Sequence, residues 1–298
     1  MKVAITGSSG LIGSALVPHL RSHGHDVLRL VRRPASAADE VTWDPTAGTV
    51  DLARLQGVEA VINLSGAGVG DHRWTDAYKK EILDSRVNST RTIATAITKL
   101  DVHPQVLVSA SAIGWYGDTG DRQVDESAPP GTGFLADVVK QWEAAASPAL
   151  AAGIPVAHPR TGLVVSSKGG AWGRMFPLFR AGLGGKLGNG RQYWSWISMR
   201  DEVNALRFLI ETPGQNGPFN LTGPEPATNE VITRVMGRLL HRPTIATAPA
   251  FALKKVLGEF STEVLGSARV VPNALTLAGF RFEDTLVDSA IEQAIRGD

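Results

Sequence analysis

The feature that most constrains this chain is a glycine-rich stretch, ITGSSGLIG, near its start. Gly7 and Gly10 follow a short apolar run, KVAIT, and Gly13 lies at the start of a segment with apolar residues at helical spacing, LIGSALVPHL. In a strand–loop–helix unit, the first glycine permits the tight turn, the second lets the backbone approach a pyrophosphate, and the third lets helix and strand pack closely. Amide groups at the helix N-terminus then bind the anion. The pattern therefore predicts a dinucleotide site.

Beyond this loop, strand-like and helix-like segments alternate along the first half of the chain. Runs such as HDVLRLV, VEAVINL and QVLVSAS are apolar and rich in β-branched residues, and helix-like stretches separate them. This order is typical of βαβ units and of a parallel sheet with both faces covered. We predict an α/β fold of Rossmann type, a doubly wound parallel sheet. Residues 134–152 are expected to form one helix, and Pro18 is expected to kink another.

Two regions differ in sequence pattern and composition, and they define the expected domains. Residues 1–165 carry the strand–helix alternation and form the predicted dinucleotide-binding domain, to which elements near residues 199–222 return. Residues 166–298 are at first rich in Gly, Arg and aromatic residues. We expect them to form a smaller lid or substrate domain, which includes a C-terminal helical segment at residues 249–298.

The composition excludes several classes of function. The 298 residues carry a net charge of +1 and no run of like charge, which argues against a nucleic-acid partner or an anionic membrane surface. Cys is absent, so disulfides, thiolate catalysis and Cys-based metal sites are excluded. His23 and His25 lack a carboxylate partner in view, and we expect no metal. Without an apolar run of membrane-spanning length, we expect a cytoplasmic protein with a small-molecule substrate, and the sequence allows a homodimer.

The end of the second strand-like run indicates which dinucleotide binds. An NAD site usually has an acidic residue there, about twenty residues after the glycine loop, that binds the ribose 2′-hydroxyl. This chain has Arg32 and Arg33 at that point. Its next acids, Asp39 and Glu40, come after a proline, too far along for this role. Because guanidinium groups bind phosphate in forked geometry, NADP is favoured over NAD. The alternative is that both arginines lie on a solvated strand end.

Several longer motifs resemble one known family. TGSSGLIG, INLSGAG, VSASAIGWYG and DESAPP are similar to segments of the extended short-chain dehydrogenase/reductases, the NAD(P)-dependent epimerase/dehydratase group. FLADVVKQWE, PRTGLVVS and TGPEPATNEVITRVMGRLLHRPT resemble an atypical, sugar-nucleotide-epimerase-like branch of that group, which has a C-terminal domain of unassigned role. The resemblance covers most of the chain and implies an NAD(P) cofactor.

The resemblance also implies roles for residues that match the family's motifs. The family's catalytic serine or threonine lies at the end of the strand that carries Ser109 and Ser111, and the spacing to the following Tyr-Gly favours Ser111. Cofactor contacts, through side chain or backbone, are implied for Gly7, Ser9, Gly10, Leu11, Ile12, Gly13, Leu64, Ser65, Gly66, Ser109, Arg160 and Thr161.

One element of the family's chemistry is missing. A Tyr-x-x-x-Lys pair usually lies on one helix face, where the tyrosine moves the substrate's proton and the lysine holds the nicotinamide ribose. The chain has three tyrosines, and none lies in the matching helix. With Lys140 in the lysine position, Ala136 stands where the tyrosine would be.

Two other registers are open for this helix. Aligning Glu143 with the family's later acidic residue places Leu135 and Val139 in the tyrosine and lysine positions. Anchoring on the preceding ESAPP segment instead places Phe134 in the tyrosine position. Every register lacks the tyrosine, which puts the usual family chemistry in doubt.

Other groups could take over part of this chemistry. Tyr116 follows Ser111 in a loop expected at the carboxyl edge of the sheet, either as a substitute proton donor or as an aromatic packed under the lid. Lys140 could contact the cofactor's ribose or phosphate, or lie solvated on its helix. Arg73 and Arg86 flank a helix that faces the expected cleft, and they would bind an anionic substrate unless they form surface ion pairs.

Two functions follow from these observations. One is an NADP-dependent oxidoreductase or epimerase-like enzyme, in which Ser111 polarises a hydroxyl or carbonyl substrate and Tyr116 or a water chain moves the proton. The other is a non-catalytic NADP-binding redox sensor or scaffold, which the missing tyrosine would explain. An ionisable group beside the substrate position would favour the enzyme, and a filled apolar space would favour the sensor.

Overall fold

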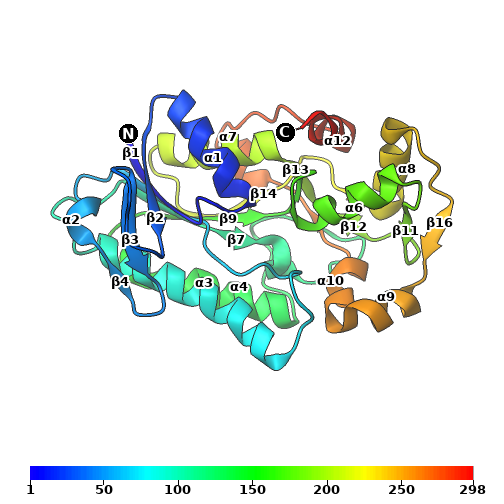
Figure 1. Ribbon diagram of the computed structural model, residues 1–298, viewed down its shortest axis with the longest axis horizontal. Helices are drawn as coiled ribbons and strands as arrows, with labels where there is room; N and C mark the ends of the chain where they lie inside the picture. Colours follow the sequence, from blue (N-terminus) through cyan, green and yellow to red (C-terminus); the bar gives the residue numbers. More distant parts are fainter. Residues whose placement is uncertain (298) are drawn as a thin grey trace.

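A parallel sheet organises the molecule (Figure 1). The computed structural model describes residues 1–297, and within them nine strands form one sheet in the order β14-β9-β6-β5-β1-β2-β3-β4, with β7 beside β9. Its pairings are parallel, except that β3 and β4 run antiparallel. The doubly wound order confirms the predicted fold class. The strands are β1 (Lys2–Thr6), β2 (Asp26–Val31), β3 (Glu40–Asp44), β4 (Thr49–Val50), β5 (Ala60–Asn63), β6 (Val106–Ser109), β7 (Ser111–Ala112), β9 (Val156–Thr161) and β14 (Gly217–Leu221).

Helices cover both faces of this sheet. On one face, α1 (Leu11–Ser22) packs against α7 (Met199–Glu211). On the other, α3 (Asp76–Ile97) packs against α4 (Phe134–Ala144) and α5 (Ser147–Ala151). Of the helices within residues 1–297, none combines the length and apolar character that a membrane span requires.

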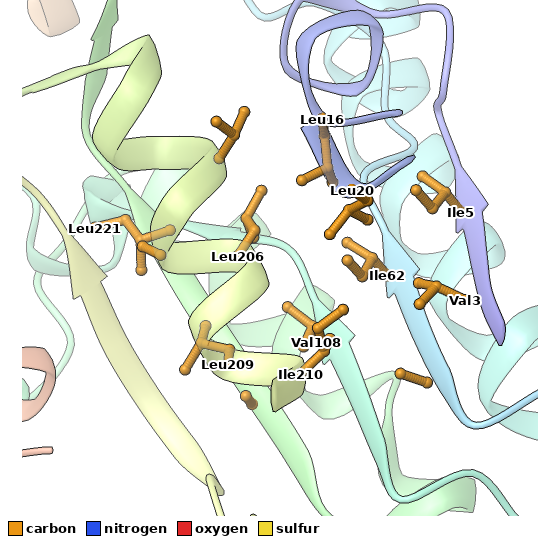
Figure 2. Close-up of a cluster of buried hydrophobic side chains, with 14 of the residues drawn as sticks. Val3, Ile5, Leu16, Leu20, Ile62, Val108, Leu206, Leu209, Ile210 and Leu221 are labelled. Carbon is orange, nitrogen blue, oxygen red and sulfur yellow. The ribbon is translucent and has the colours of Figure 1, made fainter. Parts of the chain in front are cut away.

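The side chains of the strands alternate between two apolar cores. Val3 and Ile5 of β1 face the core formed with α1 and α7. Figure 2 shows this layer, with Leu16 of α1 and Leu206 of α7 close to the strands. Ala4 belongs to the opposite core, formed with α3 and α5. Both faces of the central strands are buried, as a parallel sheet requires.

Two segments that contain proline differ from the prediction. α1 continues through Pro18 to Ser22, and its buried face holds it against the sheet although proline removes one helical hydrogen bond. The predicted single helix at residues 134–152 is wrong, because α4 ends before a second short helix, α5, begins. Pro148 lies in the first turn of α5, where its missing N–H costs nothing, and so favours a new start.

A smaller unit is built around α6 (Gly170–Arg180), α8 (Asn229–Leu240) and α12 (Val287–Arg296). Its core contains Trp172 and Trp196, so the aromatic residues that suggested a binding lid mostly pack inside. Its paired strands are β10 (Leu163–Val165) with β13 (Trp196–Ser198), β11 (Gly185–Leu187) with β16 (Ala246–Ala248), and β12 (Tyr193–Trp194) with β15 (Ala227–Thr228).

The C-terminal segment returns in part to the large sheet. β17 (Arg269–Val270) pairs with β8 (Gln123–Val124), and α11 (Asn273–Leu277) packs on β14. Leu275 belongs to the same core as α1 and α7. The remaining elements are α2 (Leu52–Leu55), η1 (Ile113–Tyr116), α9 (Ala250–Leu257), η2 (Gly258–Phe260) and α10 (Ser261–Leu265).

Candidate functional site

The glycine loop between β1 and α1 forms a tight backbone cradle. Gly7 has φ +67°, a left-handed conformation that glycine adopts without strain. A Cβ on Gly7 would lie 2.8 Å from the Leu64 carbonyl carbon, and one on Gly13 would lie 2.8 Å from Ser8 Cα. The Gly10 N–H donates to the Gly7 carbonyl at 3.0 Å. The turn itself and its close contact with the loop after β5 therefore require glycine.

The N-terminus of α1 is open to an anion. Gly10 caps this helix without a side-chain hydrogen bond, and the first turn contains no acidic residue. Ser9 and Gly10 are exposed, whereas Leu11 and Ile12 pack against the apolar core. The first amide groups of a helix lack partners within it and lie at its positive end. The residues present therefore fit the diphosphate of a dinucleotide.

The strand order places this loop where such sheets bind ligands. β1 pairs with β2 on one side and β5 on the other, so the winding direction reverses between β1 and β5. Leu64, Ser65 and Gly66 follow β5 at the same carboxyl edge. The Ser65 carbonyl accepts a hydrogen bond from Ser89 Oγ of α3 at 3.3 Å. The two loops thus meet at the topological switch point of the sheet.

The two arginines after β2 differ in their surroundings. Arg33 Nη1 and Nη2 donate to the two carboxylate oxygens of Glu40 at 2.8 Å and 2.6 Å. The hydrogen bond from Arg33 lowers the pKa of Glu40 to about 2, so Glu40 stays ionised. Arg32 is exposed, and within residues 1–297 no ion pair holds it. Of the predicted pair, Arg32 is the guanidinium available to a phosphate, and Arg33 is tied to Glu40.

Of the two candidate serines, Ser111 lies in a polar cluster. Its Oγ donates to Glu143 Oε1 at 2.6 Å. Ser109 is fully buried, and its Oγ has no hydrogen-bond partner in the described part of the chain. β9 changes its partner from β6 to β7 around Pro159, which has no N–H for the ladder. This geometry supports Ser111 as the functional serine.

The carboxylate that receives this hydrogen bond is held by a buried arginine. Arg160 Nε and Nη2 donate to the two oxygens of Glu143 at 2.8 Å and 2.9 Å, and 3% of the Arg160 side chain is exposed. Arg160 Cζ also lies 3.9 Å from the centre of the Trp115 ring. Burial alone would lower the pKa of Arg160, but the hydrogen bonds and charge of Glu143 outweigh it and raise that pKa. The Arg160 side chain, expected to contact the cofactor, belongs instead to this internal ion pair.

Tyr116 lies at the far end of the same network. Its hydroxyl donates to Asn220 Oδ1 at 2.7 Å and accepts a hydrogen bond from Arg160 Nη1 at 3.1 Å. Burial raises the pKa of the Tyr116 hydroxyl, and its proton is already donated to Asn220. The structure therefore does not support Tyr116 as the substitute proton donor. Tyr116 is instead a buried aromatic side chain whose hydroxyl helps to position Arg160.

The face of α4 that adjoins η1 carries neither tyrosine nor lysine. A Cβ on Gly114 would lie 3.3 Å from Leu135 Cβ and 3.7 Å from Val139 Cγ2. Leu135, Val139 and Glu143 are spaced four residues apart, so they share one helix face. The structure thus favours the register in which Leu135 and Val139 take the tyrosine and lysine positions.

The three other cationic residues expected at the site lie apart. Lys140 forms an ion pair with Asp137 at 2.5 Å, and 40% of the Lys140 side chain is exposed, so this geometry gives no support for a cofactor contact. Arg73 is exposed and lies beside Gly258, between α9 and η2. Arg86 is half-buried in α3, about 15 Å along the axis from the start of that helix. The expected two-armed clamp of Arg73 and Arg86 is therefore not formed.

A buried acid of α7, Glu202, lies against the end of β9 and was not predicted from the sequence. Thr161 Oγ1 donates to Glu202 Oε1 at 2.9 Å, and Glu202 is fully buried. Within residues 1–297 its Oε2 has no partner, and burial raises the pKa of Glu202 to about 8. The sequence did carry a signal, because Glu202, Leu206 and Leu209 form one stripe of an amphipathic helix. An acid in such a stripe indicates a buried carboxyl group.

Comparison with known proteins agrees with this architecture. The model of the NAD dependent epimerase/dehydratase family matches residues 3–222, and that of a domain of unknown function, DUF1731, matches residues 248–294. An epimerase family protein of Mycobacterium bovis is 46% identical over 293 residues, which cover 98% of this chain and 97% of that protein. The chloroplastic epimerase family protein SDR39U1 homolog of Arabidopsis thaliana is 35% identical over 300 residues, covering 98% and 86%. These findings confirm the resemblance seen in the motifs.

Two solved structures share the fold and have more than a quarter of their aligned residues identical to this chain. A crystal structure of human epimerase family protein SDR39U1 with NADPH matches with a TM-score of 0.90 and 28% identity, and the match covers 99% of both chains. A nucleoside-diphosphate sugar epimerase from Corynebacterium glutamicum matches with a TM-score of 0.81 and 32% identity. That match covers 99% of this chain and 58% of the other.

Proposed function

Because the chain belongs to the NAD-dependent epimerase/dehydratase family, we propose that it is an NADP-dependent oxidoreductase or epimerase-like enzyme. Its substrate would be a small molecule with a hydroxyl or carbonyl group. The observation that carries this proposal is the hydrogen bond from Ser111 to Glu143. Through this bond the Ser111 hydroxyl connects an ionisable group, the Glu143 carboxyl, to the position where the family's serine contacts its substrate.

The glycine loop supports the cofactor part of the proposal. Amides at the start of α1 would bind the diphosphate, and the loop after β5 would lie against the adenosine ribose. Arg32 would bind the 2′-phosphate that distinguishes NADP from NAD. The human relative solved with NADPH supports this choice. When bound, the nicotinamide ring would supply or accept a hydride.

The hydrogen-bond direction at Ser111 defines what this residue can do. Its only hydroxyl proton is donated to Glu143, so the Ser111 oxygen presents lone pairs to a ligand. We therefore replace the expectation of a serine that polarises a carbonyl with one that accepts a hydrogen bond from a substrate hydroxyl. As the C–H bond breaks and its hydride leaves, the hydroxyl proton would pass to Ser111 Oγ, and the serine proton would pass to the Glu143 carboxylate. Proton and charge then balance without a tyrosine.

Arg160 and Tyr116 would act as positioning residues in this scheme. Arg160 donates to both oxygens of Glu143, which holds the carboxyl group in place beside Ser111. Tyr116 accepts from the remaining nitrogen of that guanidinium. Because Ser111 already donates its proton to Glu143, its oxygen is free to accept the proton of a substrate hydroxyl, so the resting site favours oxidation of an alcohol.

A screen of alcohols and sugar nucleotides with NADP⁺, followed at the absorbance of NADPH, tests the proposal. Once a substrate is found, Ser111→Ala and Glu143→Gln should each lower kcat by about 100-fold, the usual scale of a lost proton-transfer group. Ser147→Ala, at an exposed serine, is the matched control and should keep full activity. Turnover that survives both substitutions would refute the Ser111–Glu143 relay.

One observation favours a second function. Leu135 and Val139 fill the tyrosine and lysine positions with apolar side chains, as a non-catalytic NADP-binding sensor or scaffold would allow. That protein would bind NADPH, give no turnover in the screen, and tolerate Ser111→Ala without change in affinity. The enzyme proposal is preferred because a sensor has no need for a carboxylate bonded to Ser111.

A further inference from the structure

One strand edge of the small unit is uncovered. β16 pairs in parallel with β11, and no further strand within residues 1–297 joins this pair. Figure 1 shows β16 at the outer edge of the small unit, whereas β11 is packed against α8. Ala246 and Thr247 of β16 are exposed. An edge strand is usually protected by charged side chains, by proline or by a covering element, and the sequence of β16, Ala-Thr-Ala, contains neither charge nor proline.

The backbone of Thr247 provides the free hydrogen-bonding groups of this edge. The Ala248 carbonyl accepts a hydrogen bond from the Gly188 N–H at 2.9 Å, so the backbone groups of Ala248 face β11. Successive residues of a strand direct their backbone groups to opposite sides, so the N–H and carbonyl of Thr247 point away from β11. Within residues 1–297 no strand lies on that side to pair with them.

Large apolar side chains are exposed around the same edge. Ile245, directly before β16, is 94% exposed, and Phe251, in the first turn of α9, is 76% exposed. Leu183 is 69% exposed and precedes β11, so it lies near the same end of this small sheet as Ile245. Exposed apolar side chains that gather at one place mark an interaction surface.

Cations flank both ends of the edge. Arg180 and Arg242 lie together near its start, where Arg242 Nε donates to the Arg180 carbonyl at 2.8 Å. Lys254 and Lys255 follow β16 in α9. All four side chains belong to exposed residues, and among residues 1–297 none of them has an acidic partner. Their charge is therefore available to a ligand.

The sequence around these cations contains no acid. Residues 144–200 and 231–258 include neither Asp nor Glu, so the net charge of +1 conceals a basic region at this end of the molecule. Complementary charge attracts a partner and excludes partners of the same sign. The surface around β16 therefore fits a partner that carries negative groups.

The strand edge decides between the classes of anionic partner. A membrane could accept the cations and the apolar side chains, but its interior would leave the backbone groups of Thr247 without hydrogen bonds. A nucleic acid would pair with the cations and leave Ile245 and Phe251 exposed. An added β-strand uses all three features, because its backbone pairs with the edge and its side chains meet the flanking groups.

We propose that the β16 edge is a docking site for an extended segment of another protein, rich in acidic and apolar residues. The segment adds as a third strand and exchanges hydrogen bonds with the N–H and carbonyl of Thr247. Its apolar side chains cover Ile245 and Phe251, and its carboxylates pair with the flanking cations. This role is separate from the dinucleotide site and does not depend on the proposed function.

A blocked peptide of about ten residues, with alternating glutamate and valine, is a direct probe of this edge. Calorimetry at low salt should show saturable binding to the whole chain, and a peptide with lysine in place of glutamate should bind at least about 10-fold more weakly.

Thr247→Pro tests the backbone contact, because it removes the outward N–H and leaves the groups that pair with β11 in place. It should raise the Kd for the glutamate peptide by at least about 10-fold. Thr247→Val keeps the N–H and is the matched control, with a change below about twofold. The double variant Lys254→Glu with Lys255→Glu should also raise the Kd by about 10-fold.

Hydrogen exchange at the Thr247 amide gives a readout that needs no variant, since bound peptide should slow it. The proposal is overturned by equal affinity of Thr247→Pro and Thr247→Val, by unchanged exchange at saturating peptide, or by no binding at about 1 mM peptide. Binding to phosphatidylglycerol vesicles without binding to the peptide would assign the surface to a membrane and would also overturn it.

Discussion

The two halves of the candidate site are built in different ways. Around Gly7, Gly10 and Gly13 the chain uses backbone atoms, and the family's glycine pattern is intact. Around Ser111 the chain uses side chains, and in the register that the structure favours Leu135 and Val139 stand in the positions of the family's tyrosine and lysine. The first half can bind a dinucleotide as its relatives do, whereas the second must move protons by another route or not at all.

This difference shows which parts of a site tolerate change. A backbone cradle depends on the absence of side chains, so any Cβ at Gly13 meets the loop directly. A proton-transfer site depends on one group of suitable charge within reach, and several residue types can supply it. Glu143, one turn beyond the lysine position on the same face, is such a group.

The largest expected effect concerns the half of the site around Ser111, where side chains form the network. Glu143→Ala should lower the free energy of unfolding by about 3–5 kcal/mol, because it leaves Arg160 buried without a counter-ion. The double variant Glu143→Leu with Arg160→Met should lose much less, since both charges are removed together. Urea unfolding of the three proteins measures this. A loss below about 1 kcal/mol in the single variant would mean that the pair behaves like a surface salt bridge.

Another acid, the fully buried Glu202, differs from Glu143 because no ion pair holds it within residues 1–297. Burial raises its pKa from 4.5 to about 8, so the folded protein binds a proton between these values that the unfolded chain releases. The contribution of Glu202 to stability is therefore greatest below the lower value and falls as pH rises, by up to about 1.4 kcal/mol per pH unit, until the folded pKa is passed.

Glu202→Gln should remove this slope and make the protein more stable than wild type near about pH 8. Urea unfolding at a series of pH values between about 5 and 8 gives the measurement, with Glu81→Gln as an exposed control on α3. An unchanged slope would show that Glu202 is ionised and paired in solution.

The smallest expected effect concerns Arg32, at the edge of the half of the site that the glycine loop forms. Arg32→Ala should weaken NADPH binding by about 10-fold and leave NADH binding unchanged, because the variant loses only the contact with the 2′-phosphate, which NADH lacks. Lys140→Ala should change neither affinity by more than about twofold, since Lys140 is paired with Asp137 on the surface. Equal losses for both dinucleotides in Arg32→Ala would contradict its assignment to the phosphate.

The predictable features were those set by local sequence. The strand–glycine–helix unit and the alternation of apolar runs were sufficient to predict the doubly wound sheet, because period and turn chemistry determine both. The helix boundary before Pro148 was missed, although proline in a first turn is a known start signal.

The polar site was harder to predict because its contacts join distant segments. Ser111, Glu143, Arg160 and Tyr116 come from four elements, and no spacing rule indicates that Arg160 turns toward Glu143 and away from a cofactor. The same holds for Arg86, which has no acidic partner among the described residues, a feature that is visible only after packing. Glu202 could have been found, since its place in an apolar stripe is readable from the sequence.

The most direct test of the account is a calorimetric titration of NADPH into wild type and Gly13→Ala. The account predicts saturable binding to wild type, tighter than that of NADH, and a loss of about 100-fold or more in Gly13→Ala, whose fold is checked by circular dichroism. Absence of heat with either dinucleotide in wild type, or equal binding by a folded Gly13→Ala, would contradict the claim that this backbone cradle binds the cofactor.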